Sequence, residues 1–286
     1  MPKIYYKSSN GTTFDLLEFT GCKLKEANFH KYSWGRATTK KQFGEVIDRF
    51  TKDAQLYQAK IIFRGSRAER KTKVEQFHFE TERDVANQRV GRIYWNNDYI
   101  ECYVIDSSTY PSDDNPLWTE NDVTFYCPYP FWIEEQSIDI SQSASSIRST
   151  DKGYREDDDW GYPYPYSYGT SPNTVAINID HYADSDFKLV AFGPFYEMYV
   201  NIAGNIYNVN YPALTGQYIT IDSRQSVPAD KRCFLTTAAG NTQNVFDYRN
   251  PNYSLFKKIP PGDNLVTFVR DYGIELTIYK ERSEPR

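Results

Sequence analysis

The chain has few of the residues that carry most enzyme and metal chemistry. Its 286 residues include three histidines, His30, His78 and His181, and none of them lies near another or beside a cysteine. These spacings argue against a metal cluster and against a nucleophile–base pair, so we expect no catalytic residue, metal site or cofactor. The four cysteines form no C-x-x-C pair and are predicted to be buried free thiols: Cys22, Cys102, Cys127 and Cys233.

Long apolar runs are also missing. No stretch approaches the ~20 residues that a membrane-spanning helix needs, so membrane insertion is not expected. Lys3 and Lys7 bracket only a short apolar run, which does not have the form of a signal peptide. Gly193 and Gly204 lie in no phosphate-binding pattern. The formal net charge of −5 argues against general affinity for nucleic acid.

Two acidic groups remain as candidates for chemistry. Glu156–Asp159 has the acidity of a calcium loop but not the alternating ligand spacing, which favours a solvated acidic turn. Glu134 and Glu135 adjoin Trp132, as carboxylates adjoin a stacking ring in sugar hydrolases. Neighbouring residues on a strand point to opposite faces, however, so these two carboxylates cannot flank one glycosidic bond. The sequence therefore predicts a protein that is not an enzyme.

Aromatic residues, in contrast, are abundant. They make up 16% of the chain, with 25 Tyr and 17 Phe, whereas disordered chains have few of them. Short alternating segments predict strands over 3–7, 13–19, 54–63, 92–95, 98–105 and 117–127. In the second half they predict strands over 174–179, 188–192, 195–203, 206–209, 217–222, 233–237, 245–248, 265–270 and 274–279. Strands of this number and spacing suggest a β-sandwich, and the fold class predicted is mainly β.

One or two short helices are expected in the first half. In residues 38–52, apolar side chains recur at i, i+3, i+4 and i+7, which predicts an amphipathic helix: Phe43, Val46, Ile47 and Phe50. Thr81, followed three residues later by Asp84, predicts an N-cap and a short helix over 82–88.

A basic segment lies between these two regions. Residues 60–73 contain the turn signal Gly65–Ser66 and are predicted to form a hairpin tip. Such a tip is either simply solvated or docks on an acidic partner. The candidate partner contacts are Arg64, Arg67, Arg70 and Lys71.

A domain junction is predicted within Asp122–Glu135. The strand pattern that ends at Cys127 is followed by prolines that lack N–H donors, so the strand must leave its sheet: Pro128 and Pro130. The next stretch, to about residue 172, is poor in aliphatic residues. We expect an N-terminal domain over 1–135 and a C-terminal domain over 136–286, with 136–173 as a linker or extended arm. One large β domain with a long loop is the alternative. The junction residues are Pro128, Pro130, Phe131 and Trp132.

Four motifs in this order resemble the distal tail proteins of long, non-contractile-tailed bacteriophages. The first is residues 77–107, with GRIYW at 91–95 and YIECYV at 99–104. The second is FYCPYPFW at 125–132, and the third is GYPYPYSY at 161–168. The fourth combines YITIDS at 218–223, PPGDN at 260–264 and ERSEPR at 281–286. Each motif is weak alone, and their order and separations carry the resemblance.

The resemblance implies a structural virion protein at the tail tip, part of a baseplate. Its N-terminal domain would close into a homo-hexameric ring, and its C-terminal domain would be a galectin-like β-sandwich. The partners implied are further copies of the chain, the tail tube protein, and tip, fibre or receptor-binding proteins used in host adsorption. DNA would pass through the ring without specific binding, and assembly would take place in the host bacterial cytoplasm.

A galectin-like fold also raises a carbohydrate-binding, lectin-like tail module as the alternative. Galectins bind sugar through a His-x-Asn-x-Arg strand and a Trp, but His181 does not begin that pattern, and the last Trp, Trp160, precedes the sandwich. Because a fold does not carry its function with it, we predict no sugar site in 174–286. The tyrosines there are expected to fill or edge sheets: Tyr199, Tyr207, Tyr218 and Tyr279.

Overall fold

The computed structural model of the protein is mainly β, as predicted, and describes residues 3–17, 21–110, 117–140, 173–268 and 272–286. The chain divides into two compact units. The first unit is Met1–Glu134 together with Glu281–Arg286, and the second is Glu135–Lys280. Residues 281–286 were expected in the C-terminal domain, but they pack with the first unit. None of the described helices is long and apolar enough to cross a membrane.

The first unit is built from antiparallel strands and one long helix. In pairing order its strands are β2 (Thr13–Asp15), β1 (Ile4–Lys7), β7 (Gly91–Trp95), β8 (Asp98–Tyr110), β9 (Trp118–Cys127), β6 (Gln55–Arg64) and β3 (Cys22–Ala27). A bridge between Leu17 and Lys23 links the chain after β2 back to β3, so these strands close a circuit. β10 (Trp132–Ile140) begins in this unit, paired with β8 at Ile133 and Glu134, and continues into the second unit.

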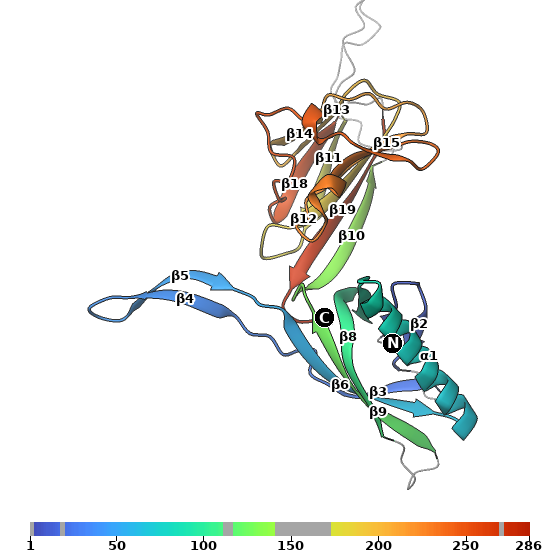
Figure 1. Ribbon diagram of the computed structural model, residues 1–286. Helices are drawn as coiled ribbons and strands as arrows, with labels where there is room; N and C mark the ends of the chain where they lie inside the picture. Colours follow the sequence, from blue (N-terminus) through green and yellow to red (C-terminus); the bar gives the residue numbers. More distant parts are fainter. Residues whose placement is uncertain (1–2, 18–20, 111–116, 141–172, 269–271) are drawn as a thin grey trace, which may run out of the picture. The chain divides into compact units, whose positions relative to one another are not determined.

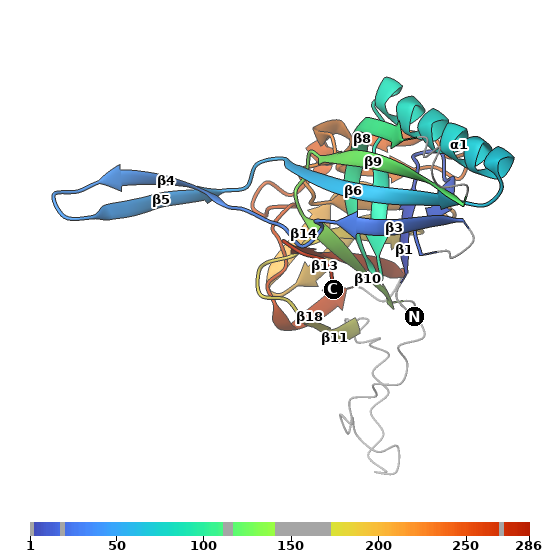
Figure 2. The same cartoon turned by 90° about the horizontal axis from the view of Figure 1, so that it is seen from below.

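Aromatic side chains fill the interior of the first unit. Period-2 alternation along β6 sends Tyr57, Ile61 and Phe63 inward, where all three are fully buried. Helix α1 (Arg67–Ala86) lies along one face of the strands (Figure 2) and adds Phe77 to this core. The Phe77 ring meets that of Phe14 edge-on, with centroids 5.3 Å apart. Such contacts fix the helix to the strands.

Helix α1 replaces two predicted features. The second half of the expected hairpin tip, residues 67–73, and most of the expected short helix, residues 82–86, fall within its 20 residues. Ser66 is the N-cap: its hydroxyl accepts from the Glu69 N–H, and the Glu69 carboxylate accepts from the Ser66 N–H at 2.7 Å. This Ser-x-x-Glu capping box is a sequence signal that starts the helix at residue 67. Thr81 is no cap, because its hydroxyl donates to the Phe77 carbonyl inside the helix at 2.9 Å.

The helix predicted over 38–52 is wrong. This segment forms an antiparallel hairpin of β4 (Gly35–Lys40) and β5 (Glu45–Thr51), which extends as a separate two-stranded ribbon (Figures 1 and 2). We call residues 35–51 the arm. Gly44 adopts φ +77° in the turn, a conformation that interrupts a helix. A helical apolar pattern specifies a helix only where its stripe is buried, and every residue of β5 is exposed.

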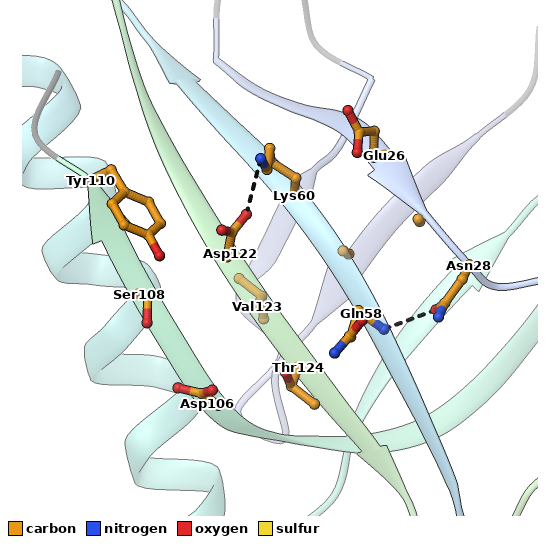
Figure 3. Close-up of a pocket in the computed structure, with 12 residues that line it drawn as sticks. Glu26, Asn28, Gln58, Lys60, Asp106, Ser108, Tyr110, Asp122, Val123 and Thr124 are labelled. Carbon is orange, nitrogen blue, oxygen red and sulfur yellow. Dashed lines mark hydrogen bonds and ion pairs between the residues drawn. The ribbon is translucent and has the colours of Figure 1, made fainter.

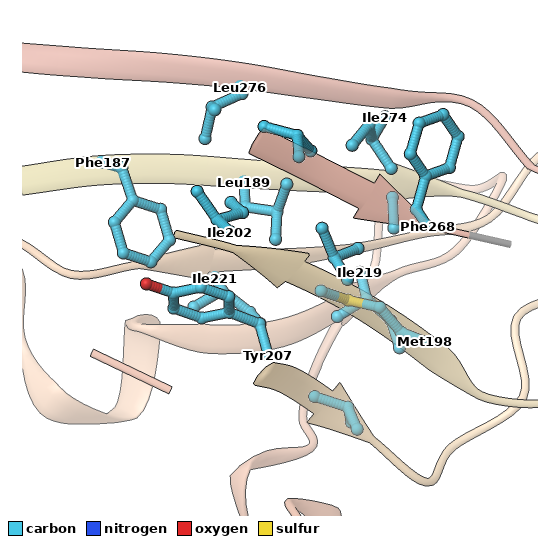
Figure 4. Close-up of a cluster of buried hydrophobic side chains, with 14 of the residues drawn as sticks. Phe187, Leu189, Met198, Ile202, Tyr207, Ile219, Ile221, Phe268, Ile274 and Leu276 are labelled. Atoms are coloured by element: carbon cyan, nitrogen blue, oxygen red, sulfur yellow. The ribbon is translucent and has the colours of Figure 1, made fainter. Parts of the chain in front are cut away.

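The second unit is a two-layer β-sandwich. One layer contains β17 (Thr242–Asn244), β16 (Cys233–Thr236), β15 (Tyr218–Asp222), β12 (Asp186–Phe192), β19 (Ile274–Arg282) and β10 in that order. The other contains β11 (Asn173–Ile179), β18 (Gly262–Phe268), β13 (Met198–Ile202) and β14 (Asn205–Val209). Figure 4 shows side chains from both layers meeting in the core, among them the fully buried Phe187, Leu189 and Leu276.

Of two local predictions for the second unit, a turn is confirmed and a strand is wrong. Ala203 and Gly204 both have positive φ and form the tight turn expected between β13 and β14. The strand predicted over 245–248 is wrong: Phe246–Tyr248 is a 3-10 turn, η2, and a second one, η1, spans Ala229–Lys231. The Asn244 side chain accepts from the Phe246 N–H at 2.9 Å, a turn that ends β17.

The linker predicted over 136–173 is partly wrong as well. Its first residues, 136–140, belong to β10, and Asn173 begins β11. The acidic segment Glu156–Asp159 and the aromatic–proline motif at 161–168 lie outside the described residues.

Candidate partner-binding surfaces

The four basic residues predicted as partner contacts do not share one surface. Arg64 ends β6 and is half-buried, and Arg70 is 8% exposed with its guanidinium directed at the Gly65 carbonyl, 3.4 Å away. Arg67 and Lys71 are exposed one turn apart on α1. Only these two of the four are therefore exposed together, and the Lys71 ammonium also lies 3.7 Å from the Glu75 carboxylate.

The exposed face of α1 continues beyond these cations. Phe79 is 65% exposed, and the Arg83 guanidinium lies 5.8 Å from its ring centroid, while Val85 is exposed six residues after Phe79. The sequence analysis missed this face because it predicted a hairpin tip over 60–73 and a separate short helix over 82–88 in place of one long helix. Basic residues at one end and apolar ones at the other make it a second candidate contact surface.

The opposite face of α1 is anchored by carboxylates. Asp84 is fully buried and accepts from the Tyr6 hydroxyl at 2.9 Å and the Ser9 hydroxyl at 2.6 Å. Burial, together with neighbouring acidic groups, raises the pKa of Tyr6 well above its ordinary value. Glu80 accepts from the Ser8 hydroxyl at 3.0 Å. These buried charges hold the β1–β2 turn to the helix and are structural.

The junction residues occupy contrasting environments. β9 ends at Cys127, directly before Pro128, and β10 begins at Trp132. Trp132 is fully buried with its ring centroid 5.8 Å from that of Phe29. Phe131 is half-buried, and the Lys52 ammonium lies 4.1 Å from the centre of its ring. Pro128 is exposed and Pro130 buried, so the four junction residues do not form one exposed patch.

The arm is the most exposed apolar feature among the described residues of the first unit. Phe43 is 88% exposed, and three further large side chains on β5 are exposed around it: Val46, Ile47 and Phe50. Residues 35–51 also carry four basic and two acidic side chains. Large apolar residues gathered on a ribbon without its own core mark an interaction surface. The sequence placed these side chains on a helix, so it missed the surface.

A polar hollow of about 600 Å³ lies on the outer face of β3, β6, β9 and β8 (Figure 3). The Lys60 ammonium is 3.6 Å from the Asp122 carboxylate and 3.7 Å from that of Glu120. The Lys25 ammonium is 2.9 Å from Glu120, which lowers the pKa of that carboxyl. These lysines are thus held by carboxylates. The hollow is lined by amides and hydroxyls as well: Asn28, Gln58, Ser108, Tyr110 and Thr124.

One histidine has a hydroxyl partner that the sequence did not reveal. His78 Nε2 lies 2.9 Å from Ser107 Oγ, and the Ser107 hydroxyl also donates to the Asn121 side-chain oxygen at 3.0 Å. Asn121 is buried, and its amide nitrogen is 3.3 Å from the same imidazole nitrogen. The three side chains lie within hydrogen-bonding distance of one another, and they connect α1 to β8 and β9. The imidazole nitrogen either donates to Ser107 or accepts from Asn121. Among the described residues, no three His, Cys, Asp or Glu side chains gather as a metal site.

Two tyrosines of the second unit are buried against neighbouring groups. Tyr207 is buried and donates to the Lys257 carbonyl at 2.6 Å, and burial raises the pKa of its phenol. Tyr279 is buried with the Arg224 guanidinium 4.0 Å from its ring centroid. Tyr218 is half-buried beside Phe192, and the backbone of Tyr199 bonds the Tyr272 hydroxyl. Neither Tyr207 nor Tyr279 has a ring face open for stacking on a sugar.

Comparison with known proteins reveals likeness in structure alone. No protein-family model matches the chain, and no curated protein matches it in sequence. Among solved structures, it is similar to the SPP1 Dit protein, described as a paradigm of the hub adsorption apparatus in phages that infect Gram-positive bacteria. The TM-score is 0.59 at 12% identity, over 98% of this chain and 99% of that one.

Two phage P2 baseplate structures in the activated conformation are similar too. The one with Ca gives a TM-score of 0.65 and the one with Sr 0.64, each at 12% identity over 100% of both chains. The chain has the fold of a phage tail-hub protein. The resemblance carried by the four sequence motifs is confirmed at this level, and the fold extends through both units.

Proposed function

We propose that this protein is a structural hub of the phage tail tip that works by assembling with copies of itself. In this role it joins the tail tube to the tip, fibre or receptor-binding proteins of host adsorption, and it catalyses no reaction. The observation that carries the proposal is the arm, an exposed apolar ribbon on a chain that shares its full-length fold with hub and baseplate proteins.

The arm suits a head-to-tail contact. Its exposed apolar side chains and excess of basic residues fit an acceptor surface that is apolar and acidic. An arm that reaches from one copy to a different surface of the next makes a heterologous interface, which generates a ring when the rotation closes. We place six copies in that ring, in a tail that is long and non-contractile, as the sequence motifs imply.

Other surfaces suit the remaining partners. The exposed face of α1, with Arg67 and Lys71 at one end and Phe79 and Val85 at the other, is a candidate contact for a neighbouring tail protein. Lys60 in the polar hollow and Lys25 beside it are both paired with carboxylates. This suits a virion component past which DNA moves without being held, because a cation held by carboxylates attracts phosphate less. The virion is accordingly the proposed location, with assembly in the host cytoplasm.

Light scattering of the full chain tests the self-association directly. Arg36 and Phe50 face each other in the arm, so replacing residues 37–49 by Asn-Gly leaves a short hairpin and removes most of the exposed apolar surface. We expect a concentration-dependent hexamer for the unaltered chain and a folded monomer for the shortened one. Lys71→Ala on α1 is the matched control and is expected to retain the hexamer. Hexamers that persist without the arm would overturn its role.

A further inference from the structure

Two of the four cysteines face each other across neighbouring strands of the first unit. β8 and β9 pair antiparallel, and the ladder ends with Tyr103 opposite Tyr126. The next residue of each strand continues this register, so Cys102 lies opposite Cys127. Both cysteines are free and fully buried in the aromatic core, and their thiols are hydrogen-bonding neighbours.

Facing residues of an antiparallel pair are spaced as a disulfide requires. Their Cα atoms are about 4.5–5.5 Å apart, and a disulfide joins residues whose Cα atoms are roughly 4.4–6.8 Å apart. Little backbone movement is therefore needed to join Cys102 to Cys127. The other two cysteines have different partners across their strands, since Cys22 lies opposite Phe63 and Cys233 opposite Ile221.

We propose that Cys102 and Cys127 form a reversible disulfide that ties β8 to the end of β9. The two thiols stay reduced in a reducing compartment and are joined in an oxidising one. In the hub proposed above, the chain folds in the reducing host cytoplasm, and the disulfide forms after the virion is released. That timing rests on the proposed function, whereas the reaction of the two thiols does not.

Hydrogen peroxide is an oxidant small enough to reach this pair. The thiolate of one cysteine attacks a peroxide oxygen, the O–O bond breaks, and the hydroxide that leaves takes up a proton to become water, which gives a sulfenic acid. The sulfur of the second cysteine then attacks the sulfenic sulfur, the S–O bond breaks, and a second water leaves. The two cysteines lose two electrons and two protons, and one peroxide becomes two waters.

The end of β9 controls access to the pair. Burial, together with the neighbouring Cys127 thiol, raises the pKa of the Cys102 thiol, so a raised pH favours the reactive thiolate. Cys127 is the last residue of β9, and Pro128 after it has no N–H with which to continue the ladder. Strand ends open more often than strand centres, so oxidation proceeds slowly, through brief opening at this end.

Treatment of the reduced full chain with hydrogen peroxide in mildly alkaline buffer tests the proposal. The free thiols counted after denaturation should fall from four to two. Mass spectrometry of peptides prepared without a reductant should find Cys102 joined to Cys127. The disulfide closes a loop of about 25 residues, so the melting temperature of the first unit should rise by about 5–10 °C and return when dithiothreitol is added.

Two variants separate this pair from the other buried thiols. Cys127→Ser should lose both the link and the rise in melting temperature, and the matched control Cys22→Ser, also buried, should keep both. Each variant is compared with its own untreated form, so a change in its basal stability cancels. If Cys127→Ser does not fold, the peptides of the unaltered chain still decide whether the link forms.

Three results would overturn the proposal. One is four unreacted thiols even in urea just below the unfolding transition, where the end of β9 opens often. Another is oxidation of the thiols without a link between Cys102 and Cys127, and the third is a link that leaves the melting temperature unchanged. The link is detected within a single chain, so failure of the hexamer would not affect any of these results.

Discussion

The two units of this protein differ in how completely each buries its own apolar side chains. Most large aliphatic residues on the strands of the second unit enter one sandwich core, where Leu189 and Leu276 are fully buried, although Leu265 on β18 is 59% exposed. The first unit has an equally well-buried aromatic core but also displays the arm, whose apolar residues are left exposed by the described part of the chain. Apolar residues in a core stabilise the fold, whereas those on a ribbon outside it are available to a partner. Similar side chains therefore serve different purposes in the two units.

The largest difference in the free energy of unfolding is expected between removing one apolar side chain from the sandwich core and removing one from the arm. Leu276→Ala in the sandwich core should lower the free energy of unfolding by about 2–5 kcal/mol, because it leaves a cavity. Phe43→Ser in the arm should leave the unfolding of the monomer within about 0.5 kcal/mol of the original. Urea denaturation of both variants measures the two changes in the free energy of unfolding. A comparable loss for Phe43→Ser would mean that the arm packs on its own chain.

Arg282→Met is expected to have the next largest effect, and it acts on the first unit although residue 282 lies near the end of the sequence. It removes the Arg282 cation from beside Asp98, whose pKa burial already raises, and leaves the weaker influence of the Arg286 charge. We expect a loss of about 2–3 kcal/mol, below the usual cost of breaking a buried pair because Glu134 is partly exposed. Thermal unfolding gives the measurement, and Arg286→Met, which keeps the backbone N–H on Asp98, is the control. No difference between the two variants would contradict the anchoring role of Arg282.

A smaller effect concerns pH. The pKa of Lys52 is about 8 in the folded protein and 10.5 when unperturbed, so between these values the unfolded chain binds more protons than the folded one. The free energy of unfolding should therefore contain a contribution from Lys52 that rises with pH from about 8 to 10.5. Denaturation across this range, compared with Lys52→Met, isolates it. Parallel pH profiles for the two proteins would show that Lys52 contributes nothing.

The last expectation is that simple sugars do not bind to the second unit. Tyr207 and Tyr279 are closed by neighbouring groups, and the galectin spacing around His181 is missing. Titration of the full chain with galactose-containing and cell-wall glycans should give no saturating chemical-shift change at millimolar concentration. Saturating shifts that disappear in Tyr218→Ala would instead support the lectin-like alternative.

Local chemistry in the sequence determined the mainly β class and most of the strands. Period-2 alternation places side chains on opposite faces wherever it occurs, and turns such as Asn10–Gly11 and Ala203–Gly204 need only neighbouring residues. The capping box at Ser66 is local as well and identifies the start of α1, although the reading as a hairpin tip overlooked it. The motif resemblance supplied the full-length fold, which the structural neighbours confirm.

The tertiary structure alone decided where each apolar stripe is buried and which distant segments meet. Residues 43–50 and α1 both have helix-like patterns, but only α1 has strands to cover, because Phe77 enters a core built by Phe14 and Phe63. Among the residues that the structure describes, the arm has no such partner, and it forms a hairpin instead. Likewise, no local signal places Ser283 on Lys52 or Arg282 on Glu134. These contacts join residues 231 and 148 positions apart in the sequence, and they exist because β10 leaves the first unit and β19 returns to it.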